Sequence, residues 1–249
     1  MPTATSYDDC IVLIPARLAA TRLPNKPLLK IAGREMVLHC YDRARAAAIG
    51  RVMVCAGDQE IVDTVKAAGG EAMLSPADLP SGTDRISYVL EKLADGDRYQ
   101  RIINLQADLP NINPTTLKKI ADSLMHKQHE MVTAVFEEKN EKNKNNPNMV
   151  KAICHLDAKK KIGRVLYFTR APAPYGNHSF FHHIGIYGYQ RKVLELFVGL
   201  KPSPLEKIEK LEQLRALENG INIFALAIDD RPQSVDTAED LAKAQKIMA

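Results

Sequence analysis

The first half of the chain alternates short apolar runs with segments of helical spacing, and this alternation restricts the folds that the chain can adopt. The runs are rich in Val, Ile and Leu and read CIVLIPA from Cys10, VMVCAG from Val52 and IINLQ from Ile102. Helical spacing lies between them, at residues 36–48, 58–68 and 83–93. This order predicts an α/β fold built from βαβ units, with a mostly parallel central sheet covered on both faces. Ligands gather at the carboxyl ends of strands connected in this way.

The second half of the chain predicts a smaller antiparallel β portion. Short runs of alternating or β-branched character follow position 150 and read VKAICH, RVLYF and FHHIGIYGY. The polar stretch EEKNEKNKNNPN from Glu137 has no periodicity and predicts a mobile surface loop. The other expected elements are a helix from Pro114 to about His129, a strand at residues 131–136, a long helix at 205–219, a strand from Ile221 and a capped helix after Val235.

Composition limits the class of protein. The 249 residues are 45% hydrophobic and 26% charged, which is typical of a soluble globular protein. A net charge of +4 is too weak to indicate a nucleic-acid binder when no basic stretch is interleaved with aromatic residues, and it suits a small polyanionic substrate equally well. The cysteines at 10, 40, 55 and 154 form no C-x-x-C pair, and no apolar run is long enough to span a bilayer. We therefore expect reduced thiols and a cytoplasmic location.

The loop after the first expected strand is unusually rich in cations. The stretch IPARLAATRLPNKPL, residues 14–28, contains Arg17, Arg22 and Lys26 together with three prolines. Such cations can neutralise a triphosphate, and prolines reduce the ordering entropy lost on binding. The alternative is a rigid surface turn with solvated cations, but the concentration of charge favours phosphate binding. The loop has neither G-K-[ST] nor G-x-G-x-x-G, which argues against the two nucleotide-binding folds that use those motifs.

Two carboxylates are candidate metal ligands. Asp108 follows a buried strand in NLQADLP, and Asp236 lies in SVDTAED. Mg²⁺ binds to a few carboxylates together with phosphate oxygens, so the pair beside a cationic loop predicts a magnesium site. Each residue has a structural alternative, since Asp108 could form a turn and Asp236 could be a helix N-cap.

Two further segments could recognise the rest of a substrate. In SPADLPSGTDRI, a helix start offers Ser81, Gly82 and Thr83 as hydrogen-bonding groups and Arg85 as a cation. The alternative is an N-cap with a solvated arginine. In YFTRAPAPYG and HHIGIYGY, the expected partners of an anionic, hydroxyl-rich substrate are Arg170, His183 and Tyr187, although a histidine on a strand is commonly structural.

A zinc site is not expected in the second of these segments. His178 and His182 lie four residues apart, but they have neither helical context nor a nearby Glu.

Together these segments resemble one family, the CMP-Kdo synthetases or 3-deoxy-manno-octulosonate cytidylyltransferases. The matching segments occur in the family's order and cover nearly the whole chain: IPARLAATRLPNKPL, SGTDR, NLQADLP, NPNMVKAI, YFTRAPAPY, HHIGIYGY, LEKIEKLEQLRALENG and VDTAEDL. LEQLRALE and HIGIYGY are the most specific, because simpler nucleotidyltransferases do not share them.

The resemblance implies a Rossmann-like nucleotidyltransferase fold in a single domain, residues 1–249, with a sugar-binding and dimerisation subregion at 150–220. It also implies a cytoplasmic homodimer that uses Mg²⁺, CTP and 3-deoxy-D-manno-octulosonate (Kdo), releases pyrophosphate and supplies lipopolysaccharide assembly. Neither nucleic acid nor membrane is an expected partner.

Site residues follow from the resemblance by position. The expected catalytic residues are Arg17, Arg22, Lys26 and Asp108, and the expected magnesium ligands are Asp108 and Asp236. The expected nucleotide-binding residues are Ala16, Arg17, Lys26, Ser81, Gly82, Thr83 and Gln106. The expected sugar-binding residues are Arg85, Arg170, His183, Tyr187, Glu212 and Gln213.

The chain departs from the family pattern at three positions. The family's usual V-Q-G-D-E-P has Gly and Glu where this chain has Ala107 and Leu109, and the family commonly has Gly where this chain has Asn25. The missing carboxylate at 109 could weaken a second magnesium position or change substrate contacts. Rival interpretations are a cytidylyltransferase for 8-amino Kdo or sialic acid, and a non-catalytic nucleotide-binding protein.

Overall fold

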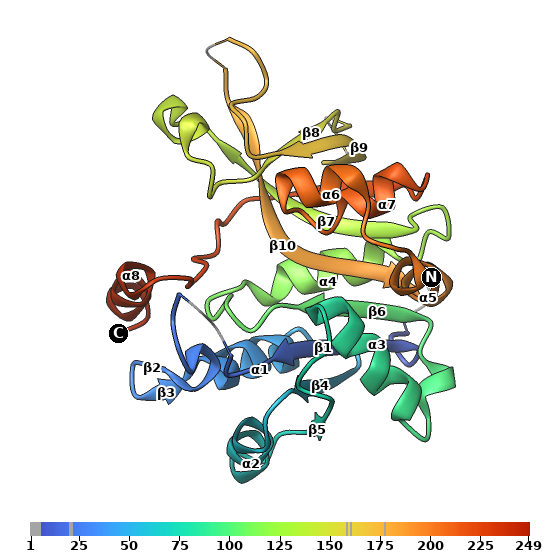
Figure 1. Ribbon diagram of the computed structural model, residues 1–249, viewed down its shortest axis with the longest axis vertical. Helices are drawn as coiled ribbons and strands as arrows, with labels where there is room; N and C mark the ends of the chain where they lie inside the picture. Colours follow the sequence, from blue (N-terminus) through green and yellow to red (C-terminus); the bar gives the residue numbers. More distant parts are fainter. Residues whose placement is uncertain (1–5, 20–21, 158, 160, 177) are drawn as a thin grey trace. The chain divides into compact units, whose positions relative to one another are not determined.

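The structure is a computed structural model that describes residues 6–19, 22–157, 159, 161–176 and 178–249 (Figure 1). The chain divides into two compact units. The first comprises residues 1–121 and 232–249, and the second comprises residues 122–231. The predicted subregion 150–220 lies within the second unit. No helix in the described part of the chain combines the length and the apolar character needed to cross a lipid bilayer.

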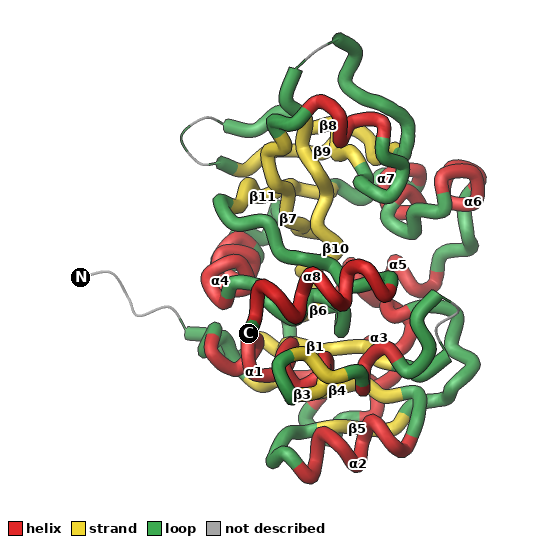
Figure 2. The backbone as a smooth tube through the Cα atoms, turned by 90° about the vertical axis from the view of Figure 1, so that its left-hand side faces the viewer, coloured by secondary structure: helices red, strands yellow, loops and turns green. Residues whose placement is uncertain are grey.

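A parallel sheet forms the centre of the first unit, as the apolar runs predict. The strand order is β5-β4-β1-β6, and every pairing among these four strands is parallel. Figure 2 shows β5, β4 and β1 side by side. All side chains of β1 and β6 are buried, which explains why their sequences show no alternation. The strands are β1 (Cys10–Ala16), β4 (Arg51–Ala56), β5 (Ala72–Leu74) and β6 (Arg101–Leu105). The strand β5 is only three residues long and is not expected from the sequence pattern.

Helices cover both faces of this sheet. The expected helices are confirmed as α1 (Met36–Ala46), α2 (Gln59–Ala67) and α3 (Gly82–Lys92). Right-handed crossovers place α1 and α2 on one face and α3 on the other, because the strand order reverses direction after β5 (Figure 1). The short elements of this unit are η1 (Lys26–Leu28), β2 (Lys30–Ile31), β3 (Arg34–Glu35) and η2 (Gly96–Arg98).

The chain end returns to the first unit as α8 (Ala238–Met248). A small apolar core joins it to the segment after β1, through Val235 and Ala244 on one side and Leu23, Ile31 and Met36 on the other. This packing brings the segment before α8 close to the cationic loop.

The second unit contains a mixed, mostly antiparallel sheet. Its strand order is β10-β7-β11-β9-β8, and β8 also pairs with β10, so the five strands close into a ring. Among the pairings of the described residues in this unit, β7 and β11 run parallel and the others run antiparallel. The strands are β7 (Met131–Glu138), β8 (Lys151–Cys154), β9 (Ile162–Thr169), β10 (Phe180–Gln190) and β11 (Ile223–Ile228). Its helices are η3 (Glu141–Asn145), α5 (Arg191–Gly199), α6 (Pro204–Glu209) and α7 (Leu214–Glu218). The helix α4 (Pro114–Ser123) belongs to the first unit up to residue 121.

The prediction of a long helix at 205–219 is wrong. The segment forms two short helices, because Lys210 adopts a left-handed conformation with φ of 54° and ends α6. The predicted helix after Pro114 is also too long, since α4 ends at Ser123 and the Ser123 hydroxyl contacts His129 Nδ1 at 2.9 Å.

The polar stretch after Glu137 is predicted to be a mobile loop, but it forms regular structure and specific contacts. Glu138 still belongs to β7, and its carboxylate accepts hydrogen bonds from Asn140 N and Asn143 Nδ2. Lys144 is buried and donates to the carbonyl oxygens of Pro174 and Gly176. Buried polar groups of this kind require partners, and the partners fix the segment.

Candidate active site

The cationic loop is anchored at both of its ends. Its start is held by the Leu18 amide, which donates to Asp58 Oδ2 at 2.8 Å, and by the Gly57 amide, which donates to the Ala16 carbonyl at 2.8 Å. Its end begins the short helix η1, whose N-cap is Asn25 with φ of 56° and ψ of 23°. Asn and Gly are the residues that tolerate this left-handed region best, so the change from the family's Gly to Asn preserves the turn.

A cavity of about 360 Å³ opens in the first unit beside this loop. It is lined by Pro15, Ala16, Arg17, Ala19, Arg22, Leu23, Lys26, Pro27, Ser81, Gly82, Arg85, Gln106, Ala107, Asp108 and Asp236. Every site residue that the sequence predicts in this unit is included, except Thr83, whose side chain is buried. The cavity lies where β1 and β6 end, as expected for a parallel sheet.

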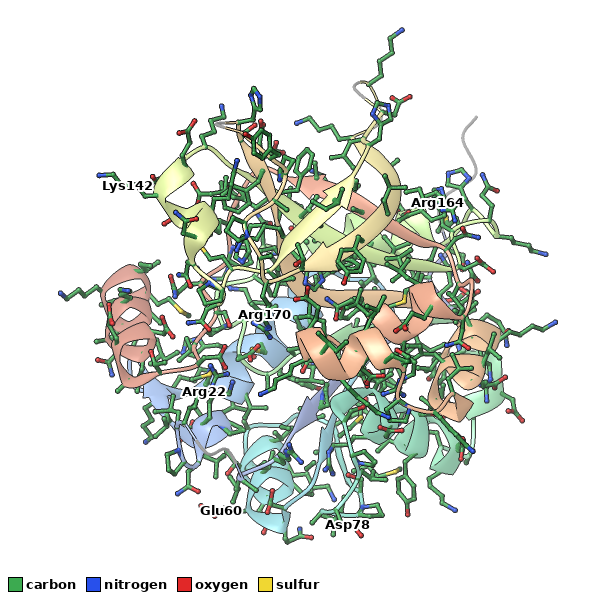
Figure 3. The ribbon with its side chains drawn as sticks, turned by 45° about the horizontal axis from the view of Figure 1, so that its top comes forward. Arg22, Glu60, Asp78, Lys142, Arg164 and Arg170 are labelled. Atoms are coloured by element: carbon green, nitrogen blue, oxygen red, sulfur yellow. The ribbon has the colours of Figure 1, made fainter. Side chains whose placement is uncertain are left out.

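Lys26 and the two predicted metal ligands form one cluster in this cavity. The Lys26 ammonium lies 2.9 Å from Asp108 Oδ2 and 3.1 Å from Asp236 Oδ1, and its side chain is only 17% exposed. Burial lowers the pKa of Lys26, but the two carboxylates outweigh burial and the pKa is raised overall. Arg22, labelled in Figure 3, is more exposed and lies 3.3 Å from Asp236 Oδ1. Groups that are 82 and 210 positions from Lys26 therefore meet at one ammonium.

The structure also decides between the two interpretations of Asp236. The N-cap of α8 is Thr237, which forms a capping box with Asp240. The Asp236 side chain is thus not used as the cap, and it lines the cavity instead. The Val235 amide donates to the Asp108 carbonyl at 3.0 Å, which aligns the backbones that carry the two carboxylates.

The second predicted segment forms the N-terminus of α3. Ser81 is the N-cap, and its hydroxyl accepts from the amides of Thr83 and Asp84. Gly82 allows a close approach, because a Cβ at this position would lie 3.1 Å from Pro15 Cγ and 3.5 Å from Gln106 Oε1. Ser81, Gly82 and Gln106 therefore line the cavity, whereas Thr83 does not.

Asn104 is a supporting residue that the sequence analysis missed. It is buried on β6, and its Oδ1 accepts from Gln106 Nε2 at 2.8 Å. This contact orients the Gln106 amide with its Oε1 toward Gly82. An Asn among the apolar residues of a buried strand was the available signal, since a buried amide requires a partner.

Arg85 is buried rather than solvated, so the structural alternative for this residue is wrong. Its guanidinium lines the cavity and donates to Ser75 Oγ and to the carbonyls of Pro76 and Ala77. Burial lowers its pKa, and Arg17 lowers it further. Arg85 is therefore fixed in place by the segment before α3.

The second unit brings together part of the predicted sugar-binding set. The His183 and Tyr187 rings on β10 lie 5.4 Å apart, and the nearby Glu212 carboxylate contributes to raising the pKa of Tyr187 after the larger effect of burial. His183 contacts Thr133 Oγ1 through Nε2 at 3.0 Å. Burial, and to a smaller extent His182, lowers the pKa of His183 to about 3, so this imidazole is neutral at pH 7. Gln213 is buried at the start of α7.

Arg170, labelled in Figure 3, is held by backbone carbonyl groups of the second unit. Its Nε donates to the Glu209 carbonyl, Nη1 to the Pro147 carbonyl and Nη2 to the Lys210 carbonyl. Lys151, fully buried on β8, donates in turn to the carbonyls of Asn146 and Arg170. The guanidinium therefore joins Pro147 to the Glu209–Lys210 segment of the second unit.

Comparison with known proteins identifies a family for this chain. A protein-family model described as Cytidylyltransferase matches residues 11–223. A 3-deoxy-manno-octulosonate cytidylyltransferase of Nitrobacter hamburgensis is 48% identical over 96% of this chain and 92% of its own length. One of Rhizobium etli is 45% identical over 98% of this chain and 97% of its own length.

Solved structures give the same result. A CMP:2-keto-3-deoxy-manno-octonic acid synthetase complexed with CTP is 33% identical, covers 97% of this chain and 98% of its own, and superposes with a TM-score of 0.87. A UDP-glucose pyrophosphorylase, at 14% identity over 96% of this chain and 97% of its own with a TM-score of 0.67, shares the fold alone. The expected Rossmann-like α/β nucleotidyltransferase fold is thus confirmed. This chain belongs to the 3-deoxy-manno-octulosonate cytidylyltransferase family.

Proposed function

We propose that this chain transfers the cytidylyl group of CTP to Kdo and releases pyrophosphate. The observation that supports this most strongly is the cluster of Lys26, Asp108 and Asp236 beside the cationic loop, at the carboxyl ends of β1 and β6. In keeping with the family resemblance, we place the reaction in the cytoplasm, where its product would supply lipopolysaccharide assembly.

The chemistry is an in-line substitution at phosphorus. The anomeric 2-hydroxyl of Kdo attacks the α-phosphorus of CTP, the new P–O bond forms, and the bond to the β-phosphate oxygen breaks. Arg17, Arg22 and Lys26 neutralise the charge that develops on the leaving pyrophosphate. Ser81, Gly82 and Gln106 hold the nucleoside end of CTP in the same cavity. Positioning of the two substrates supplies much of the rate, and no protein nucleophile is required.

The two carboxylates fit a magnesium ion. In the described residues no three His, Cys, Asp or Glu side chains gather in a way that would hold a metal by themselves, so Asp108 and Asp236 form a site of only two oxygen-donor residues. Mg²⁺ suits such a site, since it is commonly bound by one or two carboxylates with substrate phosphates and water completing its coordination. When bound, Mg²⁺ would offset phosphate charge and lower the pKa of the attacking hydroxyl.

We assign the recognition of Kdo to Arg85, Arg170, His183, Tyr187, Glu212 and Gln213. The neutral imidazole of His183 and the phenol of Tyr187 suit hydroxyl groups rather than the sugar carboxylate. The guanidinium groups of Arg85 and Arg170 are the candidates for binding the Kdo carboxylate, and each also donates to backbone carbonyl oxygens.

We further propose that the second unit forms a homodimer. Leu166 on β9 is 65% exposed and Ile208 on α6 is 75% exposed, and large apolar side chains on a surface are often covered by a partner. The family resemblance supports the same assembly.

The test of the proposed function is pyrophosphate release from CTP and Mg²⁺ with Kdo, 8-amino Kdo and N-acetylneuraminic acid in parallel. Release with Kdo alone is the expected result. Release with another sugar but not with Kdo would support cytidylyl transfer and show that the substrate is that other sugar. Binding of CTP without pyrophosphate release for any sugar would favour a non-catalytic nucleotide-binding protein.

A further inference from the structure

The two proposed metal ligands already share a cation, and that cation belongs to the protein. One ammonium bridges Asp108 Oδ2 and Asp236 Oδ1 at 2.9 and 3.1 Å. Two carboxylates brought together by folding repel each other unless a positive charge lies between them. Lys26 therefore does what a divalent cation would do at this position, which is to hold the two acids side by side.

A divalent cation and the ammonium cannot both occupy this position. Mg²⁺ binds oxygen at about 2.0–2.1 Å, so an ion shared by the same two oxygens would enter the space that the Lys26 ammonium fills. The two positive charges would also repel strongly at such a separation, since little of this side chain faces solvent. Metal binding to these same two oxygens thus requires the Lys26 ammonium to leave them.

Only the side chain of Lys26 needs to move. Its backbone is fixed at the start of η1, where the Leu28 amide donates to the Asn25 carbonyl and the Leu29 amide donates to the Lys26 carbonyl. The flexible four-carbon stem allows the ammonium to reorient within the cavity that it lines. A bound triphosphate in that cavity would offer it new anionic partners.

We propose that Lys26 is an exchangeable counterion, which holds Asp108 and Asp236 together before substrates bind and transfers to the triphosphate when a divalent cation takes its place. This inference rests on the proposed magnesium site and adds the order in which the two carboxylates bind lysine and metal. Without nucleotide, the protein's own lysine competes with the metal. With nucleotide, the lysine has another partner and the competition ends.

The test measures metal binding without nucleotide, using Mn²⁺ alone as the probe and electron paramagnetic resonance of free Mn²⁺ as the readout. Lys26→Met should bind Mn²⁺ about tenfold or more tightly than the unmodified protein, because the competing charge is gone. Lys26→Arg retains the competitor and should bind as weakly as the unmodified protein. Adding Asp108→Asn to Lys26→Met should abolish the gain.

Arg22→Gln is the matched control for charge. It removes one positive charge near the same Asp236 oxygen, but Arg22 is exposed and has no contact with Asp108 at ion-pair distance in the structure. Its effect on Mn²⁺ affinity should stay within about threefold. A gain as large as that of Lys26→Met would show general charge repulsion and overturn the exchange.

A second readout covers the case in which Lys26→Met folds poorly. Circular dichroism establishes whether each variant folds. If Lys26→Met does not fold, Lys26→Gln takes its place, because glutamine retains hydrogen-bond donors without the charge. Mg²⁺ should raise the melting temperature of either neutral variant more than that of the unmodified protein, because a ligand stabilises in proportion to its binding.

The remaining outcomes separate this inference from the proposed function. Equal Mn²⁺ affinity in the unmodified protein and Lys26→Met, lost in Asp108→Asn, would leave the metal site in place and overturn the exchange. Failure of Lys26→Met to bind Mn²⁺ at these carboxylates without nucleotide would overturn the exchange, because removing the competing charge would then free no site. The proposed metal site would be overturned only if Mn²⁺ also failed to bind in the presence of CTP.

Discussion

Neighbouring residues 108 and 109 have opposite environments. Asp108 reaches into the cavity, whereas the side chain of Leu109 is only 3% exposed and belongs to the apolar core of the first unit. The sequence could show that Leu109 replaces the family's usual Glu, but not which way the side chain points. In the structure, an acidic side chain at position 109 on this backbone would be buried. Burial of a carboxylate without a partner lowers the stability of the fold.

Leu109→Glu should therefore destabilise the protein by about 3 kcal/mol or more, through lost packing and a buried carboxyl group. Leu109→Met is the matched control, with an expected loss below about 1.5 kcal/mol because volume and polarity are retained. Urea unfolding at pH 7 measures both. A Glu variant as stable as the Met variant would show that position 109 has a polar partner after all.

At the scale of elements, the cationic loop depends on one backbone conformation. Asn25 starts η1 with a positive φ, which a β-branched residue adopts only at a cost. Sequence comparison alone suggests a change in loop geometry where Asn replaces Gly. The conformation shows instead that both residues fit the same turn.

Asn25→Gly should change the free energy of unfolding by less than about 1 kcal/mol, while Asn25→Val should cost about 1–2 kcal/mol. Because the same turn positions Lys26, the Val variant should also raise the KM for CTP. Denaturant unfolding and initial rates measure these effects. Equal behaviour of the two variants would contradict a strained turn at Asn25.

The helix predicted at 205–219 fails for a reason that lies outside its own sequence. Its Leu, Glu and Lys residues have good helix propensity, but Arg170 takes the carbonyls of Glu209 and Lys210, at the point where α6 ends. Tertiary contacts here outweigh local preference. Buried apolar strands such as β1 were predictable, because a continuous run of apolar residues indicates a strand that is buried on both faces.

Arg170→Ala should lower the melting temperature, because three backbone carbonyls lose a charged donor and the expected cost is about 1–3 kcal/mol. Arg170→Lys should recover little of this, since an ammonium cannot reproduce the planar set of donors. Thermal unfolding without substrates is the measurement. An unchanged melting temperature for the Ala variant would indicate that the residue acts only on substrate.

At the scale of the whole molecule, stability should depend on pH through buried histidine. The pKa of His183 is lowered to about 3, well below its ordinary value of 6.5, chiefly by burial. The unfolded chain therefore binds the proton more readily than the folded one. His183 contributes stability above pH 6.5, and this contribution falls as the pH drops below that value.

Between pH 6.5 and pH 5, His183 should account for a loss of about 1.5 kcal/mol of unfolding free energy. His183→Gln should make the decline less steep, and His155→Gln, at an exposed position, controls for the substitution itself. Urea titrations at the two pH values measure the difference. Identical declines in all three proteins would show that His183 is accessible to protons in the folded state.

From sequence alone, the cationic loop and the two carboxylates could be grouped as a phosphate and magnesium site, and the family resemblance supported the same grouping. Lys26, Asp108 and Asp236 are far apart in the chain, and no spacing rule brings them to one ammonium. Periodicity indicated that ligands bind at the carboxyl ends of the strands, and the resemblance indicated which residues there contact which part of the substrates. The supporting contacts of Asn104 and Arg85 could not be predicted, because they depend on which polar groups burial leaves facing each other.

The most direct test of the central claim, that these carboxylates serve cytidylyl transfer, is the turnover of Asp108→Asn with saturating CTP, Kdo and Mg²⁺. Asp42→Asn is the control, because that carboxylate pairs with Arg34 on the surface of α1. We expect kcat for pyrophosphate release to fall about 100-fold or more in Asp108→Asn and to stay close to normal in the control. Near-normal turnover of folded Asp108→Asn would contradict the account.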